Sequence, residues 1–205
     1  MRTMKDDAVS MKPQAIYLDT TVFFEARFCF SRGPLADLAL LALEKDIWLW
    51  SSDIALTELQ VAMRDRVRDI QASYEKAHGV LQHCQNLSAP SPDSIESAVR
   101  DALDAVKNFF HDEDVSVLSV ESLDESDTAR IFEDYFNSRG CFSNKGKRTE
   151  FPDAFQIAMI LRAVRTGEKV IVVSNDKDFA EGFADVPEVQ VIRSVEKVLP
   201  ILRQL

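Results

Sequence analysis

Four acidic residues have the types and positions that metal-dependent phosphodiester chemistry requires. Asp19 follows the apolar run AIYL, Glu58 follows SSDIALT, Asp153 follows EFP, and Asp176 follows KVIVVSN. These segments lie far apart in the chain, so only the fold can bring the four carboxylates together. Two unit charges about 4 Å apart repel by roughly 4 kcal/mol at an effective dielectric constant of 20. A pocket that holds all four therefore requires bound cations or raised pKa values.

The chemistry of these side chains favours Mg²⁺ or Mn²⁺, because hard divalent ions prefer oxygen ligands. The three cysteines and three histidines are scattered and lack the spacing of a zinc site. Two divalent ions in such a pocket can activate a water, hold a phosphate and stabilise the leaving oxygen. The pattern thus predicts hydrolysis of phosphodiester bonds.

Each acid also has a purely structural interpretation. Asp19 and Asp176 can cap the helices that follow them, and Asp153 can complement the dipole of a helix that begins beside Pro152. Glu58 can be a solvated side chain. The functional interpretation depends on all four reaching the same edge of one sheet.

The composition is that of a soluble globular protein, with 205 residues, 46% of them hydrophobic and 28% charged. One domain over residues 1–205 is predicted. No apolar run approaches the roughly 20 residues of a membrane span, and residues 1–13 show no secretory signal. A cytoplasmic protein with no membrane association is expected.

The net charge of -10 argues against a nucleic-acid partner, because phosphate contacts need clustered lysine and arginine. The charge is uneven, however, since a basic segment precedes Asp153 and contains Arg139, Lys145, Lys147 and Arg148. We treat Lys145, Lys147 and Arg148 as candidate substrate-binding residues. A solvated loop is the alternative, and the sequence does not choose between them.

Strands and helices are predicted to alternate along the chain. Expected strands cover residues 15–18, 47–50, 115–120, 170–173 and 189–192. Expected helices cover 35–43, 53–84, 94–110, 125–136, 152–164, a short stretch after 178, and 194–199. This alternation predicts a three-layer α/β/α fold around a mostly parallel five-stranded sheet.

The middle of the chain departs from this alternation. Apolar residues recur at helical spacing at Leu56, Leu59, Met63, Val67, Ile70, Tyr74, Ala77 and Leu81. At about 1.5 Å per residue this helix would be some 45 Å long, more than a compact sheet can cover. A break at residues 88–92 precedes a second stripe, so we predict a helical hairpin insert over about residues 64–114.

Connectivity places the acids at one edge. Functional groups of open α/β sheets gather at the carboxyl ends of the strands. Asp19 and Asp176 lie at or just beyond such ends, and Asp153 begins a helix that leads back into the strand before Asp176. Glu58 is expected to join them from the second turn of its helix.

The residues resemble the PIN-domain nucleases in four segments, in order: IYLDTTVF with Asp19, SSDIALTEL with Glu58, EFPDA with Asp153, and VSNDKDF with Asp176. The resemblance implies a five-stranded parallel sheet and an acidic pocket that binds Mg²⁺ or Mn²⁺ and cuts RNA. Asp19 and Asp153 would be metal ligands, completed by Glu58 and Asp176. Secondary candidates are Thr20, Ser174, Asn175 and Asp178.

Several functions stay open at this point. A metal-dependent endoribonuclease could be the toxin of a toxin-antitoxin pair, with an antitoxin as partner, or an RNA-processing or defence enzyme. A non-catalytic PIN-like interaction module is one alternative. A haloacid-dehalogenase-type phosphatase fits poorly, because its motif requires a second Asp where this chain has Thr21. RNA versus DNA, homo-oligomer formation and the role of the insert are undetermined.

Overall fold

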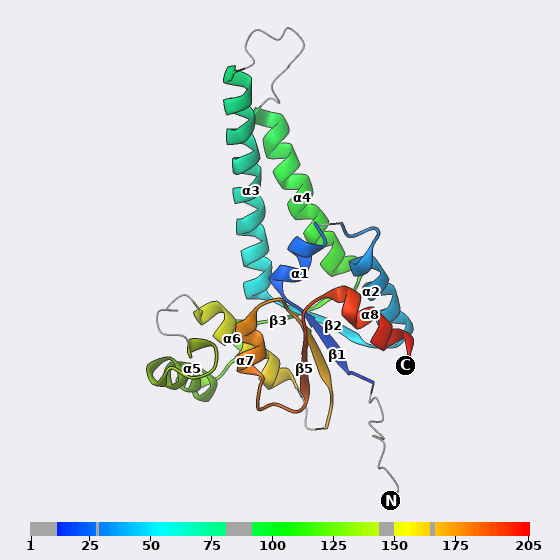
Figure 1. The fold of residues 1–205 in the computed structure, drawn as a ribbon, viewed down its shortest axis with the longest axis vertical. Coiled ribbons are helices and arrows are strands. Elements are labelled where there is room, and N and C mark those ends of the chain that lie inside the picture. The colour runs from blue at the N-terminus through cyan, green and yellow to red at the C-terminus, as the bar shows by residue number, and fades with distance from the viewer. Residues whose placement is uncertain (1–11, 28, 81–91, 144–149, 165–166) are drawn as a thin grey trace, which may run out of the picture.

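A computed structural model describes residues 12–27, 29–80, 92–143, 150–164 and 167–205. Its centre is a five-stranded sheet in which every pair of neighbouring strands is parallel, in the order β3-β2-β1-β4-β5 (Figure 1). The strands are β1 (Ala15–Leu18), β2 (Trp48–Ser52), β3 (Ser116–Leu118), β4 (Val170–Val173) and β5 (Val189–Ile192). Helices cover both faces, so the predicted three-layer α/β/α class is confirmed, and the sheet is entirely parallel.

The period-two alternation of β1 divides the core into two layers. Ile16 and Leu18 face a core that contains residues of α1 (Thr20–Glu25), α2 (Pro34–Glu44), α8 (Val195–Arg203) and the end of α4 (Pro92–Asp112). Ala15 and Tyr17 face the opposite core, with α5 (Glu125–Asn137), α6 (Phe151–Ala163) and α7 (Lys177–Gly182). All four residues of β1 are fully buried, as expected of a central strand.

The predicted helical hairpin is present as α3 (Asp53–Val80) and α4, which pack together and project from the sheet (Figure 1). Leu59 and Met63 of the expected stripe are buried, but Ile70 is 62% exposed and Ala77 is also exposed. This part of the apolar stripe is not buried, because α3 there projects beyond the sheet alongside α4 (Figure 1). Residues 81–91, with Leu81 and most of the predicted break, lie outside the described residues.

Two predicted strands differ at their ends. The strand predicted over residues 47–50 begins at Trp48 and continues through Ser51 and Ser52. Both serine hydroxyls are buried, and that of Ser51 donates a hydrogen bond to the Leu18 carbonyl at 3.0 Å. The polar groups are therefore satisfied inside the sheet, which apolar periodicity does not reveal. The strand predicted over 115–120 is shorter, because Ser119 caps a short 3₁₀ turn that follows β3.

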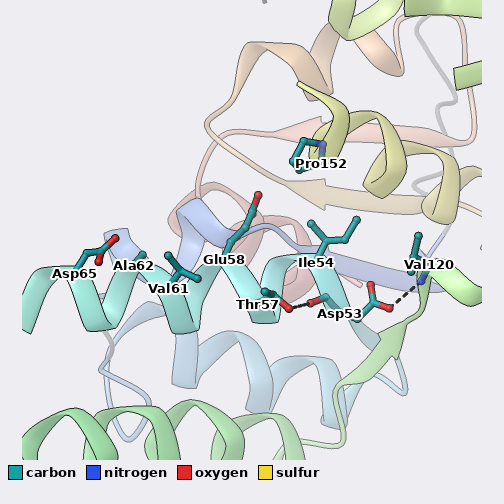
Figure 2. Close-up of a pocket in the computed structure, with 9 residues that line it drawn as sticks. All are labelled: Asp53, Ile54, Thr57, Glu58, Val61, Ala62, Asp65, Val120 and Pro152. Carbon is teal, nitrogen blue, oxygen red and sulfur yellow. Dashed lines mark hydrogen bonds between the residues drawn. The ribbon is translucent and has the colours of Figure 1, made fainter. Parts of the chain in front are cut away.

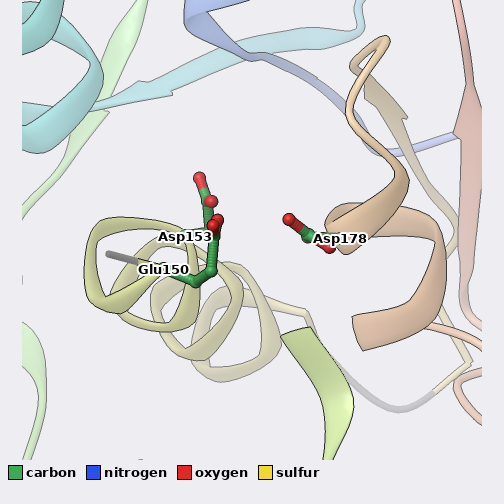
Figure 3. Close-up of side chains that lie close together, drawn as sticks. All are labelled: Glu150, Asp153 and Asp178. Carbon is green, nitrogen blue, oxygen red and sulfur yellow. The ribbon is translucent and has the colours of Figure 1, made fainter. Parts of the chain in front are cut away.

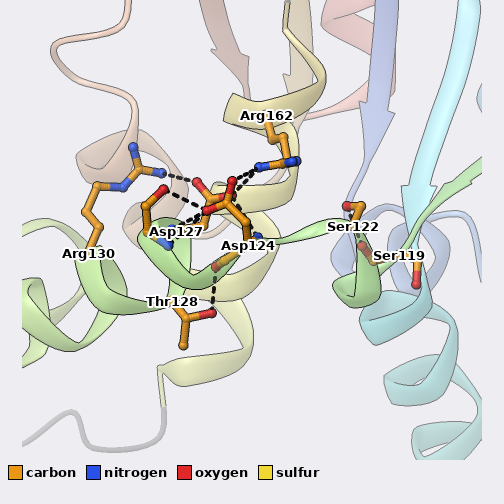
Figure 4. A network of polar contacts seen from close by, with 8 residues as sticks. Ser119, Ser122, Asp124, Asp127, Thr128, Arg130 and Arg162 are labelled. Atoms are coloured by element: carbon orange, nitrogen blue, oxygen red, sulfur yellow. Dashed lines mark hydrogen bonds and ion pairs between the residues drawn. The ribbon is translucent and has the colours of Figure 1, made fainter.

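An ionic contact joins α5 to α6. Asp124 and Asp127 form a capping box at the start of α5, and Arg162 Nη1 lies 2.7 Å from Asp124 Oδ2 and 2.8 Å from Asp127 Oδ2 (Figure 4). Arg162 lies near the end of α6, the helix whose first turn carries Asp153. The contact ties together two helices that cover one face of the sheet.

None of the described helices is long and apolar enough to cross a membrane.

Candidate metal centre

Asp19 follows the central strand β1 and is only 4% exposed. Its Oδ2 accepts hydrogen bonds from the hydroxyls of Thr21, at 2.7 Å, and Ser174, at 2.8 Å. It also caps α1 by accepting from the Thr21 backbone amide. Burial raises the pKa of Asp19, and these hydrogen bonds oppose that shift. The carboxylate is thus held in one orientation by two elements of the sheet edge.

Ser174 and Asp176 follow the neighbouring strand β4. Ser174 is 1% exposed and its hydroxyl joins the two strand ends, because it donates to Asp19 and accepts from the Asp176 backbone amide at 3.0 Å. Asp176 caps α7 by accepting from the Asp178 amide at 2.9 Å. The capping role foreseen for Asp19 and Asp176 therefore exists, alongside their position at the edge.

Glu58 reaches the same edge from the second turn of α3. Its Oε2 accepts a hydrogen bond from the Thr20 hydroxyl at 2.8 Å, and Thr20 itself is almost completely buried. Burial raises the pKa of Glu58, the Thr20 hydrogen bond lowers it, and the charge of Asp19 raises it. Glu58 is consequently a half-buried member of the acid cluster and has a partner that fixes its side chain.

Replacing Thr20 by valine should weaken Mn²⁺ binding by about 10-fold, as is typical when a hydrogen bond that orients a ligand is lost. Valine preserves the shape of the side chain but removes the donor to Glu58. Titration calorimetry of the variant with Mn²⁺ measures the effect. Thr128→Val is a matched control, because its hydroxyl donates within α5 to the Asp124 carbonyl. Equal Mn²⁺ affinity in both variants would exclude a role for Thr20.

Asp153 occupies the first turn of α6, and its carboxyl group is strongly perturbed. Its pKa is raised to about 8, first by burial, then by a hydrogen bond with the Glu150 side chain and by the charges of Asp176 and Asp19. Burial and the neighbouring negative charges therefore favour the protonated form of Asp153 in the metal-free protein. The surrounding carboxylates create a site where added positive charge is strongly favoured.

Glu150, Asp153 and Asp178 lie close together (Figure 3). One carboxylate oxygen from each lies within 4.8 Å of those from the other two. Asp178 comes from the start of α7 and is 1% exposed. Sequence reasoning missed Glu150, although it lies three residues before Asp153, the spacing that places two side chains on one face of a helix. The donors are all carboxylate oxygens, so the set fits Mg²⁺ or Mn²⁺.

Asp153 feels the charges of Asp19 and Asp176, and Glu58 feels that of Asp19, but of the four predicted acids only Asp153 belongs to the close set with Glu150 and Asp178. Other candidates lie elsewhere or outside the described residues. Asn175 is exposed, and its side chain donates to Glu25 of α1 at 3.2 Å. Lys145, Lys147 and Arg148 lie outside the described residues. Arg139, from the same basic segment, is exposed and lies 3.8 Å from Glu133.

A groove with a volume of about 680 Å³ runs along α3 from Asp53 to Asp65, with Glu58 near its middle. Figure 2 shows Glu58 beside it, with Pro152 of α6 on the opposite side. Its walls are mainly apolar, its acidic members are Asp53, Glu58 and Asp65, and no lysine or arginine lines it among the described residues. Its charge does not suit a phosphate backbone.

The fold and the site together define a class: three-layer α/β/α proteins with an acidic, oxygen-only site at the carboxyl edge of a parallel sheet. Within that class, a family model described as "PIN domain" matches residues 16–179. The chain belongs to the PIN-domain family, a family of nucleases. The matched residues include Asp19, Glu58, Asp153 and Asp176. No curated protein and no solved structure matches the chain.

Proposed function

We propose that this protein is a metal-dependent endoribonuclease that hydrolyses phosphodiester bonds at the acidic edge of its sheet. One observation carries the proposal: Asp19, Asp153 and Asp176 come from separate elements to one sheet edge, where burial, a hydrogen bond with Glu150 and repulsion from the charges of Asp176 and Asp19 raise the pKa of Asp153 to about 8. Such mutual repulsion is costly for a folded protein, and divalent cations relieve it. Perturbed carboxyl groups of this kind concentrate at functional sites.

Asp19 and Asp153 would hold Mg²⁺ or Mn²⁺, with Asp176, Glu58, Glu150 and Asp178 completing the pocket. Bound there, the ion supplies Lewis-acid stabilisation of the phosphate and a more acidic water. Ser174 and Thr21 orient Asp19 through hydrogen bonds to its Oδ2. Thr20 orients Glu58 in the same way. These contacts fix the carboxylates before substrate arrives, which lowers the reorganisation needed for catalysis.

The substrate we propose is RNA, with the segment that contains Lys145, Lys147 and Arg148 contacting its phosphates. The basic composition of that segment supports this role. A toxin paired with an antitoxin, an RNA-processing enzyme and a defence nuclease are all compatible with such an activity.

The phosphatase alternative has less support. Its motif requires a second aspartate at the position of Thr21, whose hydroxyl donates to Asp19. A threonine there has no readily ionised group with which to act as a general acid. The non-catalytic alternative predicts metal binding without turnover, and the experiment below separates it from the nuclease.

The test is cleavage of end-labelled single-stranded RNA and DNA in Mn²⁺, Mg²⁺ or EDTA. We expect RNA to be cut with either metal and not in EDTA, and Asp19→Asn to reduce the rate by about 100-fold, at the upper end for lost metal-site interactions. Asp124→Asn is a matched control, because Asp124 also caps a helix, α5, but is itself exposed and is not one of the cluster acids. Asparagine retains capping ability in both places.

Each contrary outcome has a defined meaning. Cleavage that survives EDTA would contradict a metal-dependent mechanism. Mn²⁺ binding without cleavage of either polymer would favour the non-catalytic module. Preferential cutting of DNA would retain the nuclease and replace the proposed substrate.

A further inference from the structure

Three polar side chains lie buried beneath the acidic edge and bond to one another. Tyr17, Ser52 and Gln156 are each 0% exposed. Tyr17 Oη lies 2.6 Å from Gln156 Oε1 and 2.9 Å from Ser52 Oγ, and Ser52 Oγ lies 3.2 Å from Gln156 Oε1. The contacts join residues that are 35, 139 and 104 positions apart in the chain. They therefore link elements that no local structure connects.

Each of these residues lies on, or directly next to, an element that presents a cluster acid. Tyr17 precedes Asp19 by two residues on β1, and Gln156 follows Asp153 by three residues on α6. Ser52 ends β2 and accepts from the Ala55 amide at 3.0 Å, which caps the helix that carries Glu58. The three rigid elements that present Asp19, Glu58 and Asp153 thus meet at one set of hydrogen bonds.

We propose that Tyr17, Ser52 and Gln156 form a positioning triad that fixes β1, α3 and α6 relative to one another and so sets the separation of the carboxylates of Asp19, Glu58 and Asp153. This role rests on the proposed function, because the separation of the carboxylates matters only if they bind a metal ion. Apolar packing is non-directional, whereas hydrogen bonds specify both distance and angle.

The chemistry of the triad supports positioning over simple core packing. Gln156 Nε2 is buried without a hydrogen-bond partner among the described residues. An apolar side chain of similar size would avoid the desolvation cost of this unpaired group. Tyr17 reaches both partners through its one hydroxyl, so the loss of that single group breaks two of the three contacts.

The test compares Tyr17→Phe and Gln156→Met with Ile160→Val in the intact chain. Tyr17→Phe removes only the hydroxyl, and Gln156→Met keeps the length of the side chain without its amide. Ile160 is fully buried on the same helix, so its truncation lowers stability without removing a triad bond. Three quantities are measured for each: Tm, Mn²⁺ affinity by calorimetry, and kcat and KM for RNA cleavage.

We expect both triad variants to weaken Mn²⁺ binding and to lower kcat by about 10-fold or more, with KM for RNA unchanged. Ile160→Val should have a lower Tm but an unchanged Mn²⁺ affinity and kcat. The double variant should be no worse than the more damaging single variant, because both remove one shared network. Ser52→Ala provides an independent third measurement if either variant fails to fold.

Two failures are distinguishable. An unmodified protein that neither binds Mn²⁺ nor cuts RNA would overturn the proposed function, and the metal-placing role with it. The second failure leaves the proposed function intact. If the unmodified protein is active, and the triad variants lose Mn²⁺ affinity and kcat no more than Ile160→Val does for the same loss of Tm, the positioning role of the triad is overturned.

Discussion

Replacing Asp153 by asparagine is expected to reduce metal-dependent cleavage by about 1,000-fold or more, comparable with the loss of an essential catalytic group. Asparagine has nearly the same shape but supplies no negative charge to a cation. Asp153 is also the point at which the charges of Asp19 and Asp176 converge, so its loss removes both a ligand and the centre of the cluster. Single-turnover cleavage of labelled RNA in Mn²⁺ measures the effect.

The same substitution should change how stability depends on pH. The pKa of Asp153 is 3.8 as a reference value and about 8 in the folded protein. Between these values the folded state retains a proton that the unfolded state has lost, so stability falls as pH rises through this window. The slope is about 1.4 kcal/mol per pH unit for one proton. Asp19 and Glu58, whose pKa values are also raised, add to the fall.

We therefore expect metal-free Asp153→Asn to show a flatter pH profile than the unmodified protein, and a higher Tm at pH 8. Denaturant unfolding in EDTA from pH 5 to pH 8 measures this profile. Asp37→Asn is the control, because Asp37 is also a first-turn acid, on α2, but is exposed. Parallel pH profiles for Asp153→Asn and the unmodified protein would contradict the raised pKa.

Replacing Phe23 by alanine is expected to cost about 3–5 kcal/mol of unfolding free energy, the range for a large aromatic side chain lost from a core. Phe23 follows Asp19 by four residues on α1 and is 0% exposed. Its ring centroid lies 5.6 Å from that of Phe110, 6.0 Å from Phe109 and 6.3 Å from Phe30. It therefore joins the helix after Asp19 to the base of the hairpin.

Urea unfolding measures this loss, with Phe24→Ala as the matched control. Phe24 is the next residue in the same helix and is 37% exposed, so its truncation should cost much less. A loss below about 1 kcal/mol for Phe23→Ala would contradict the packing of α1 against the end of α4, because cavity formation in a closed core exceeds that value.

The alternation of apolar and helical runs determined the fold class. The strands predicted over residues 15–18, 170–173 and 189–192 match β1, β4 and β5 in every residue. β1 and β4 are continuous apolar runs that are buried on both faces, so composition alone identifies them, whereas β5 is an edge strand with the exposed Gln190 between apolar residues. The end of β2 was misplaced, because Ser51 and Ser52 are buried by hydrogen bonds that apolar periodicity cannot reveal.

The sequence by itself also nominated Asp19, Glu58, Asp153 and Asp176, because chain connectivity brings the carboxyl ends of parallel strands to one edge. Only the tertiary structure decided which side chains surround them. Glu150 and Asp178 lie close to Asp153, and Ser174 bonds to Asp19 across 155 residues. Tyr17, Ser52 and Gln156 gave no sequence signal, since a buried polar residue differs from an exposed one only in its distant partners. Local pattern determines an element and its faces, whereas contacts between distant elements depend on three-dimensional packing.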